Sequence, residues 1–381
     1  MTTLRGMTWE HPRGYDCQVA AAKEYARLTG IDVHWEYRSL QAFADQPIAV
    51  LAARYDLLVI DHPHVPLAAA EGLLAPLDGA GHDAQLAALA SDAVGNSHAS
   101  YAHDGHQYGL ATDSAAQVAV HRPDLLPAAP TDWDGVLELA REGMVLWPAK
   151  PIDAYSTLCT LAANRGTPVA AEPGRFLAED DAGAVLDLMH RLADRVPEWC
   201  LAANPIEVAE ALAGERTERW AYAPLAYGYT NYSRPGFRPH RLRYVDIPAG
   251  SRGVAGSQLG GAGIAVSAHS TELDAARAYA LWLASPEIQS VVYYDAGGQP
   301  GYASSWDDDR LNEDSWDFFR GTRQTLEGAW VRPRTGGYME FQDTVSLWVS
   351  AALRGELTDA ELVSRANDLA ERLLTTEEVR R

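Results

Sequence analysis

The order of apolar and polar positions predicts an α/β arrangement at the start of the chain. Residues 4–9 fit a short strand, and residues 31–37 alternate apolar and polar side chains, as a strand with one covered face does. Between them lies a helical pattern that Asp16 is expected to cap and Gly30 to end. Residues 55–60 form a continuous apolar run that is typical of a buried parallel strand. Two strand–helix–strand units therefore predict a lobe with a parallel sheet.

The rest of the chain is richer in helical patterns. Asp132 is expected to start the first of these helices. Further helices are expected at 154–165, 181–195, 205–213, 271–284, 341–353 and 359–374, and strands at 220–227 and 260–267.

Length and composition indicate two hydrophobic cores. The chain has 381 residues, whereas single cores stop growing near ~250–300 residues. Its 47% hydrophobic and 22% charged residues are ordinary for a globular protein. We therefore expect a chain that is folded almost from end to end.

The net charge of −21 argues against nucleic acid and anionic membranes as partners, because both select basic surfaces. No run approaches the ~20 apolar residues of a membrane span, so no membrane insertion is expected. The first residues lack the features of a secretory signal, and Cys17 lacks those of a lipoprotein anchor. As it stands the chain is expected in the cytoplasm, and outside it only if a precursor was trimmed. Three widely spaced cysteines, Cys17, Cys159 and Cys200, are expected to be small buried residues.

Short segments along the chain carry loosely matching motifs. They are 71–78 (EGLLAPLD), 108–113 (YGLATD, with Ala111 where proline is usual), 121–126 (HRPDLL), 130–133 (PTDW) and 285–289 (SPEIQ). In this order they resemble the extracellular solute-binding proteins of family 1, the sugar-binding branch of the ABC importer receptors. The resemblance covers nearly the whole chain, although each motif alone is loose.

The resemblance implies a two-lobed periplasmic-binding-protein-like fold of type II, with a ligand cleft between the lobes. It places residues 1–110 and 265–300 in the first lobe, and residues 111–264 and 301–381 in the second. The function it implies is the capture of a small polar ligand, a carbohydrate or an acidic metabolite, as a component of an ABC transporter. An ABC permease would then be the partner, and no cofactor is implied.

Candidate ligand-binding residues follow from the rule that ligands bind beyond the carboxyl ends of strands in open α/β sheets. The rule and the resemblance select Trp9, His11, Arg13, Tyr15, His62, His64, Asp113, Trp147, Tyr155, Tyr227, Tyr229, Gly260, Gly261 and Tyr338. The two glycines do not form a dinucleotide fingerprint, and they are expected to let backbone amides approach a ligand or a strand closely.

Several roles remain open for these residues. Trp9 and Tyr15 could stack on a sugar ring, or Trp9 could be a core residue. Arg13 could bind a carboxylate or phosphate at two points, or it could be a solvated loop residue. His62 and His64 are expected on one side of an extended loop. They could contact a ligand, make structural hydrogen bonds, or bind a metal together with His11.

An enzyme on the same fold is the alternative function. Glu10, His11, His62, His64 and Asp113 could supply acid–base chemistry if they converge. No established catalytic motif supports it, and no catalytic or metal-binding set is predicted. A separate group of histidines, His98, His103 and His106, is expected in a solvated loop.

Overall fold

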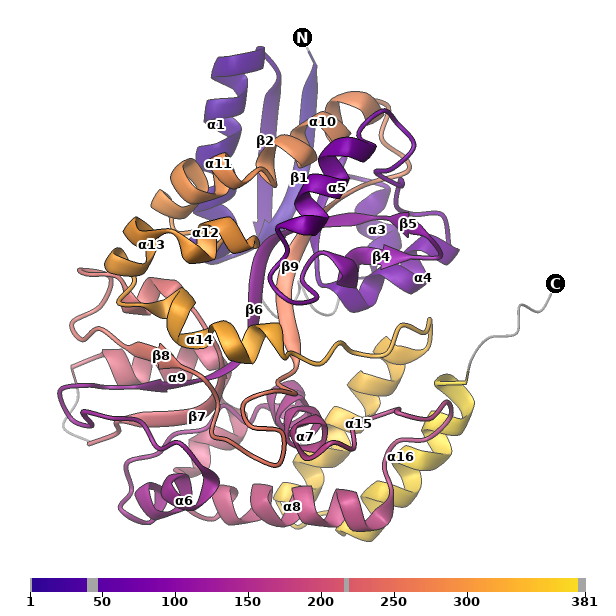
Figure 1. The fold of residues 1–381 in the computed structure, drawn as a ribbon. Helices are drawn as coiled ribbons and strands as arrows, with labels where there is room; N and C mark the ends of the chain where they lie inside the picture. Colours follow the sequence, from indigo (N-terminus) through magenta and orange to yellow (C-terminus); the bar gives the residue numbers. More distant parts are fainter. Residues whose placement is uncertain (1, 40–46, 216–218, 376–381) are drawn as a thin grey trace. The chain divides into compact units, whose positions relative to one another are not determined.

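The structure is a computed structural model that describes residues 2–39, 47–215 and 219–375 (Figure 1). The chain forms two compact units. Unit 1 comprises Met1–Ser114 and Gly260–Leu311, and unit 2 comprises Ala115–Leu259 and Asn312–Arg381. The chain therefore passes from one unit to the other after residues 114, 259 and 311, whereas the predicted lobes divide it after residues 110, 264 and 300.

Unit 1 is built on a sheet whose first three strands are parallel, as the sequence predicts. Strand β1 (Thr3–Trp9) pairs with β2 (Asp32–Arg38) on one side and with β3 (Leu57–Ile60) on the other. Figure 1 shows β1 and β2 side by side, with α1 (Cys17–Thr29) against β2.

The start of α1 differs from the prediction. Asp16 has helical backbone angles and makes no side-chain cap, because a π-helical turn, η1 (Pro12–Asp16), runs directly into α1. His11 is the residue that caps this turn: its backbone is extended and its side chain accepts a hydrogen bond from the backbone N–H of Arg13. The predicted end is confirmed, since Gly30 closes α1 in the left-handed conformation with φ 75°.

The strand that completes this part of the sheet runs against the parallel direction of the first three. β9 (Leu259–Val266) pairs with β3 in the antiparallel direction, in the strand order β2-β1-β3-β9-β6. β9 comes from a distant part of the chain, so no helical crossover imposes a parallel direction on it.

The continuous apolar run of β3 is explained by burial on both of its faces. Leu57 and Val59 belong to one hydrophobic cluster of unit 1, and Leu58 and Ile60 belong to another. Successive side chains of a strand point to opposite faces, so both faces of the sheet are covered here.

Helices and short strands cover this sheet and fill the rest of unit 1. They are α3 (Ile48–Ala52), η2 (His62–His64), α4 (Val65–Ala70), α5 (Asp83–Ser91), η3 (Ala99–Tyr101), β4 (Ala102–His103), β5 (His106–Gln107), α10 (Leu273–Leu283), α11 (Pro286–Ile288), η6 (Gln289–Tyr293) and α12 (Ala303–Asp307). Helix α13 (Asp309–Asp314) spans the boundary with unit 2.

The expectation of a solvated loop is wrong for one of the three histidines beyond α5. His98 is 6% exposed, and its ring lies 6.5 Å from that of the buried Tyr302. Burial lowers the pKa of His98 to about 4. His106 is half exposed and has an acidic partner that sequence spacing did not reveal, because its Nδ1 lies 2.8 Å from the carboxylate of Asp78.

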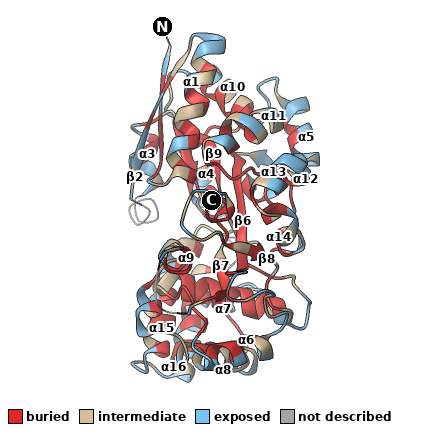
Figure 2. Ribbon diagram, turned by 90° about the vertical axis from the view of Figure 1, so that its left-hand side faces the viewer, coloured by how far each residue is buried: buried red, intermediate tan, exposed pale blue. Residues whose placement is uncertain are grey.

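Unit 2 combines antiparallel strands with a larger set of helices. β6 (Gly109–His121), which crosses from unit 1, pairs with β7 (Tyr222–Tyr227) and β8 (Arg243–Val245). The helices are α6 (Trp133–Arg141), α7 (Pro151–Arg165), α8 (Glu179–Ala193), η4 (Glu198–Ala202), α9 (Pro205–Ala213), η5 (Thr230–Ser233), α14 (Phe318–Glu327), α15 (Tyr338–Leu353) and α16 (Asp359–Leu373). Figure 2 shows α7 largely buried.

Local signals read from the sequence hold in unit 2. The side chain of Asp132 accepts a hydrogen bond from the backbone N–H of Gly135 at 2.9 Å and so caps α6 as expected. The prediction that Cys17, Cys159 and Cys200 are buried is confirmed, and all three are free thiols. Burial raises the pKa of Cys159 to about 12, so this thiol stays protonated.

A buried carboxyl group in unit 2 has consequences for stability. Asp153 lies in the first turn of α7 and is 6% exposed. Burial raises its pKa from 3.8 to about 8, against the attraction of Lys150 and with a small contribution from Glu207. The folded state therefore binds this proton more tightly than the unfolded chain does.

This shift predicts how an Asp153→Asn variant responds to pH. Protonation of Asp153 stabilises the folded chain fully below about pH 4, and this contribution is lost as pH rises toward about 8. The amide does not titrate. The free energy of unfolding of the variant, measured relative to that of the wild type, should therefore rise by ~1.4 kcal/mol per pH unit in this range. Urea denaturation at several pH values measures the difference. Asp134→Asn, at an exposed position in the first turn of α6, is the control for replacing an aspartate by asparagine outside the core.

Candidate functional site

The carboxyl ends of β1, β2 and β3 meet at one edge of the unit 1 sheet, because these strands are parallel. β9 runs the other way, and its Gly263 pairs with Ile60, so its first residues lie beyond the end of β3. We call this the carboxyl edge of unit 1. The predicted site residues in or next to its loops are Trp9, His11, Arg13, Tyr15, His62, His64, Gly260 and Gly261. Asp113, another predicted residue, accepts a hydrogen bond from Arg13.

The loop after β1 is held in a tight turn by its own backbone. The N–H of Tyr15 donates to the carbonyl of His11 at 2.7 Å, and the hydroxyl of Thr8 donates to the carbonyl of Gly14 at 2.9 Å. A Cβ atom at Gly14 would lie 2.4 Å from the ring of Trp9, so the turn requires glycine at this position. Trp9 itself is 5% exposed and is part of the core of unit 1.

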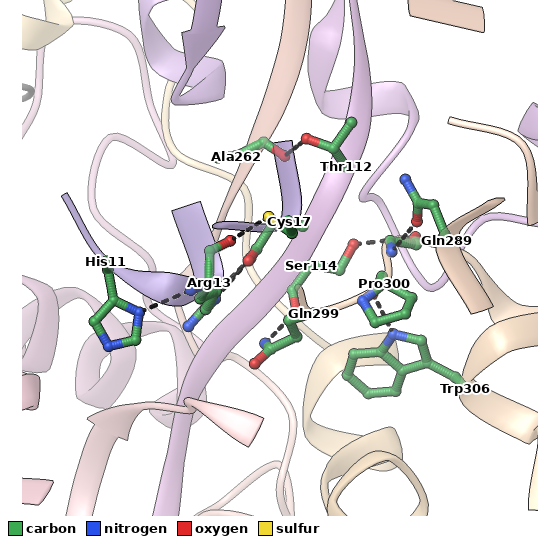
Figure 3. Close-up of polar contacts among 12 residues, drawn as sticks. His11, Arg13, Cys17, Thr112, Ser114, Ala262, Gln289, Gln299, Pro300 and Trp306 are labelled. Carbon is green, nitrogen blue, oxygen red and sulfur yellow. Dashed lines mark hydrogen bonds and ion pairs between the residues drawn. The ribbon is translucent and has the colours of Figure 1, made fainter. Parts of the chain in front are cut away.

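Arg13 is buried and forms a two-point ion pair with Asp113. Its Nε and Nη2 donate to the two carboxylate oxygens of Asp113, and the two side chains are 5% and 1% exposed. The Cys17 thiol donates to the backbone carbonyl of Arg13 at 3.1 Å (Figure 3). The interpretation of Arg13 as a solvated loop residue is therefore wrong. The carboxylate that its guanidinium binds at two points is that of Asp113, in the same chain.

The strand that carries Asp113 is fixed on both sides of this residue. The hydroxyl of Thr112 donates to the carbonyl of Ala262 at 3.4 Å, and the hydroxyl of Ser114 donates to that of Gly301 at 3.1 Å (Figure 3). The amide of Gln299 donates to the carbonyl of Ser114 at 2.8 Å. Asp113 is thus presented to Arg13 by a rigid frame.

Charge at this position is balanced. Burial raises the pKa of the Asp113 carboxyl, the Arg13 guanidinium opposes that rise, and the nearby Asp61 adds to it. The two-point hydrogen bond favours the ionised pair, so the arginine charge is offset within unit 1.

The two histidines after β3 do not lie in an extended loop. His62–His64 forms one turn of 3₁₀ helix, in which residues two apart point in directions that differ by about 240°. The two rings therefore do not share a side, which corrects the prediction. His62 is completely buried, 3.3 Å from the Asp61 carboxylate and edge-on to the ring of Tyr101, whereas His64 is half-buried.

No group of three or more His, Cys, Asp or Glu side chains in the described part of the chain could hold a metal ion. The combination of His11 with His62 and His64 does not form such a group.

The remaining predicted residues lie in unit 2, where hydrogen bonds connect most of them to α7. Trp147 donates from Nε1 to the hydroxyl of Thr157 at 3.0 Å, and the hydroxyls of Tyr155 and Tyr338 lie 3.3 Å apart. All three aromatic side chains are 0% exposed. Burial raises the pKa of both tyrosines well above the usual value, so their hydroxyls are neutral.

Gln258 joins the last part of this network. Its Nε2 donates to the hydroxyls of Tyr227 and Ser156, each at 2.9 Å. Tyr229 is 8% exposed and packs edge-on against Tyr232. The role of the unit 2 aromatic residues as ligand contacts remains a prediction.

Two residues at the carboxyl edge were not selected from the sequence. Tyr37 and Arg38 end β2, and Arg38 pairs with Trp9 in the sheet register. The rule that selected the loops after β1 and β3 applies equally to β2, whose alternating pattern had been recognised. This signal was therefore available in the sequence.

Comparison with known proteins assigns the family. Residues 20–315, more than three quarters of the chain, match the family described as bacterial extracellular solute-binding protein. The chain belongs to this family. No curated protein matches it. The resemblance inferred from the short motifs is confirmed, and membership of this family supports a solute-binding role for the chain.

Solved structures with the same fold cover nearly the whole chain. Maltose-bound MalE3 of T. maritima has a TM-score of 0.84 at 18% identity, with 98% of this chain and 100% of that chain covered. The GacH receptor of Streptomyces glaucescens, solved with and without acarbose, has a TM-score of 0.80 at 18% identity, covering 98% and 99%. A ribitol complex from Agrobacterium radiobacter has a TM-score of 0.78 at 19% identity, covering 97% and 98%.

These similarities confirm the predicted fold class, the two-lobed α/β fold of solute-binding proteins. Within the described residues, no helix is both long enough and apolar enough to cross a membrane.

The buried ion pair yields a stability prediction. Arg13→Ala should lower the free energy of unfolding by about 3–5 kcal/mol, because it leaves the Asp113 carboxylate buried without its partner. The double variant Arg13→Met/Asp113→Leu should recover most of the loss. Urea denaturation at neutral pH measures both.

The matched control is Arg5→Ala, which removes a half-exposed pair with Glu36 at 2.9 Å. Exposed pairs contribute only ~0–1 kcal/mol. Equal losses for Arg5→Ala and Arg13→Ala would show that burial does not increase the contribution of the Arg13–Asp113 pair to the free energy of unfolding.

Proposed function

We propose that this solute-binding protein takes up a neutral polyhydroxylated solute, a carbohydrate or a polyol, and delivers it to an ABC permease. The carboxyl edge of unit 1 would supply contacts to the ligand, and Tyr227 and Tyr229 remain candidate contacts in unit 2. Membership of the solute-binding family supports the proposal.

The observation that favours a neutral ligand is the Arg13–Asp113 pair. An acidic metabolite would be expected to bind a buried arginine as its counter-ion, but Asp113 already offsets this charge. The net charge of −21 also repels anions. Of the two ligand classes expected from the sequence, the neutral one is therefore favoured.

Related structures support the same class. The similar proteins of T. maritima and Agrobacterium radiobacter were solved with maltose and ribitol, both uncharged polyhydroxylated compounds. Identities of 18% and 19% fix the fold rather than the ligand, so these compounds serve here as probes.

The location of the protein follows from the proposed partner. A receptor for an importer would act outside the cytoplasmic membrane, and the description of the family as extracellular supports this location. A chain that is not exported would instead remain in the cytoplasm. Cell fractionation of the native host, followed by immunoblotting, distinguishes these two locations, and recovery in the cytoplasmic fraction alone would contradict a role in import.

Isothermal titration with maltose, ribitol and glucuronate tests the proposed ligand class. We expect binding of a neutral probe, with an affinity that changes little between about 50 and 500 mM NaCl, because no net charge is neutralised on binding. Glucuronate should bind more weakly than the neutral probes. Tighter binding of glucuronate, with a strong dependence on salt, would contradict the proposal.

His64→Ala should weaken the binding of a neutral probe by about 1–3 kcal/mol if the imidazole makes a buried hydrogen bond to the ligand. The half-buried position of His64 at the carboxyl edge motivates this prediction. His34→Ala, at an exposed position in β2, is the matched control and should leave affinity unchanged. The same titrations compare the two variants.

A further inference from the structure

β2 is the outermost strand of the unit 1 sheet. It stands first in the strand order β2-β1-β3-β9-β6, and within the described residues it pairs with β1 alone. Natural edge strands are usually protected against pairing by being short or by containing proline. β2 has seven residues and no proline, so neither of these features prevents another strand from pairing with it.

Alternate residues of β2 turn their backbone groups away from β1. The N–H of Asp32 donates to the carbonyl of Thr2 at 3.3 Å, and the carbonyl of Arg38 accepts from the N–H of Glu10 at 2.8 Å. Backbone groups alternate in direction along a strand, so the even-numbered residues bond to β1 and the odd-numbered ones face outward. The outward-facing residues are Val33, Trp35 and Tyr37. Their backbone groups form no hydrogen bond with another described residue, and they can therefore pair with a further strand.

The sequence of β2 is complementary to itself in one antiparallel register. Two copies that pair about Trp35 place Asp32 of one strand opposite Arg38 of the other. The same register places His34 opposite Glu36, and an imidazole can donate a hydrogen bond to a carboxylate. These positions are the non-hydrogen-bonded pairs of the ladder, where facing side chains approach most closely. Each charged or titratable side chain of the strand therefore meets a complementary one.

The neighbouring registers that use the same outward-facing groups lack this complementarity. A shift of two residues in one direction places Asp32 opposite Glu36 and His34 opposite itself. A shift in the other direction places Glu36 opposite itself and His34 opposite Arg38. Like charges that face each other across a strand pair are destabilising. The order of charges along β2 thus favours the register about Trp35 over both of its neighbours.

The exposed side chains along β2 are accessible to a second copy. The side chain of Glu36 is 50% exposed, although Arg5 and Tyr55 donate hydrogen bonds to it at 2.9 and 2.7 Å. His34 is exposed, and no described residue forms an ion pair with it. An imidazole from a second copy can therefore reach the carboxylate of Glu36.

Two exposed apolar side chains lie near the ends of the strand. Tyr37 is 48% exposed at one end, and Leu28 is 54% exposed in the last turn of α1, shortly before β2 begins. In the register about Trp35, Tyr37 of one copy faces Val33 of the other, at the end that follows Leu28. Pairing would therefore remove apolar surface from water at both ends of the interface.

We propose that the chain forms a two-fold homodimer through β2, in which the strands of two copies pair in the antiparallel direction about Trp35 and their unit 1 sheets become continuous. A two-fold interface brings the same surface of both copies together, so this surface must be complementary to itself. The order of side chains along β2 has this property. The interface also covers the open edge of both copies, so association stops at the dimer. This inference does not depend on the identity of the solute.

Sedimentation velocity of the full chain, at loading concentrations from about 1 to 200 μM, tests the association. The wild type should show a reversible equilibrium between monomer and dimer. Tyr37→Pro removes an outward-facing N–H that β1 does not use, and Tyr37→Thr removes the same ring but keeps the N–H. The proline variant should dissociate at least about tenfold more readily than the threonine variant, because the dimer loses two hydrogen bonds. Proline is tolerated on edge strands, and thermal unfolding at the lowest concentration checks that both variants are folded.

Cysteine cross-linking tests the register. The native thiols of the chain are buried, so cysteines introduced at the exposed positions 34 and 36 are the accessible ones. A mixture of His34→Cys and Glu36→Cys chains should form a disulfide-linked dimer with oxidised glutathione, because facing residues in a non-hydrogen-bonded pair lie within disulfide range. Either variant alone should remain largely monomeric on a non-reducing gel.

A charge variant tests the facing pair directly. His34→Glu places a carboxylate opposite Glu36 at two symmetry-related positions, whereas His34→Lys places an ammonium group there. The glutamate variant should dissociate at least about fivefold more readily than the lysine variant. Equal dissociation constants would exclude the contact.

The other outcomes overturn the inference. A wild type that stays monomeric at every concentration has no such interface. A dimer that the proline variant leaves unchanged, or in which the mixed cysteine chains do not cross-link, is formed by another surface. Cross-linking of His34→Cys alone, or of Glu36→Cys alone, would show a shifted register and would contradict the selection by charge.

Discussion

The buried pair of Arg13 and Asp113 is the interaction on which the carboxyl edge of unit 1 depends. Removing two charges from water carries a large desolvation penalty, which is offset only by close, two-point geometry. That geometry requires the loop after β1 to turn tightly at Gly14 and requires β6 to hold Asp113 in place. The path of the loop and the position of the strand are therefore coupled through one ion pair.

Much of the fold could be predicted because its signals are local. The apolar run of β3, the αL glycine at the end of α1 and the capping aspartate of α6 each depend on neighbouring residues alone. The direction of β9 could not be predicted, because it depends on a partner strand about 200 residues earlier in the chain. Neither could the 3₁₀ turn at His62–His64, since the local preference of an X-Pro segment for extended backbone gave way to the helix that follows.

The candidate site was predictable to the extent that strand ends define it. The rule that ligands bind beyond the carboxyl ends of strands selected the loop that carries Arg13 and the loop after β3. The same rule, applied to β2, also selects Tyr37. Partnerships were not predictable, because the sequence does not show that the carboxylate for Arg13 comes from position 113. In unit 2, Trp147 and Tyr155 show why aromatic residues are ambiguous: a tyrosine that fills a core and one that faces a ligand have the same sequence signature.

The order of strands in unit 1 also bears on the way the chain can fold as it is synthesised. β9 lies between β3 and β6, yet it is made about 140 residues after β6 ends. Until β9 emerges, the nascent chain has a gap in the middle of its sheet, and β3 presents an unpaired hydrogen-bonding edge. Contacts between segments so distant in sequence form slowly. The first 114 residues therefore cannot complete their core alone, and an incomplete chain would expose a surface that favours aggregation or binding to a chaperone.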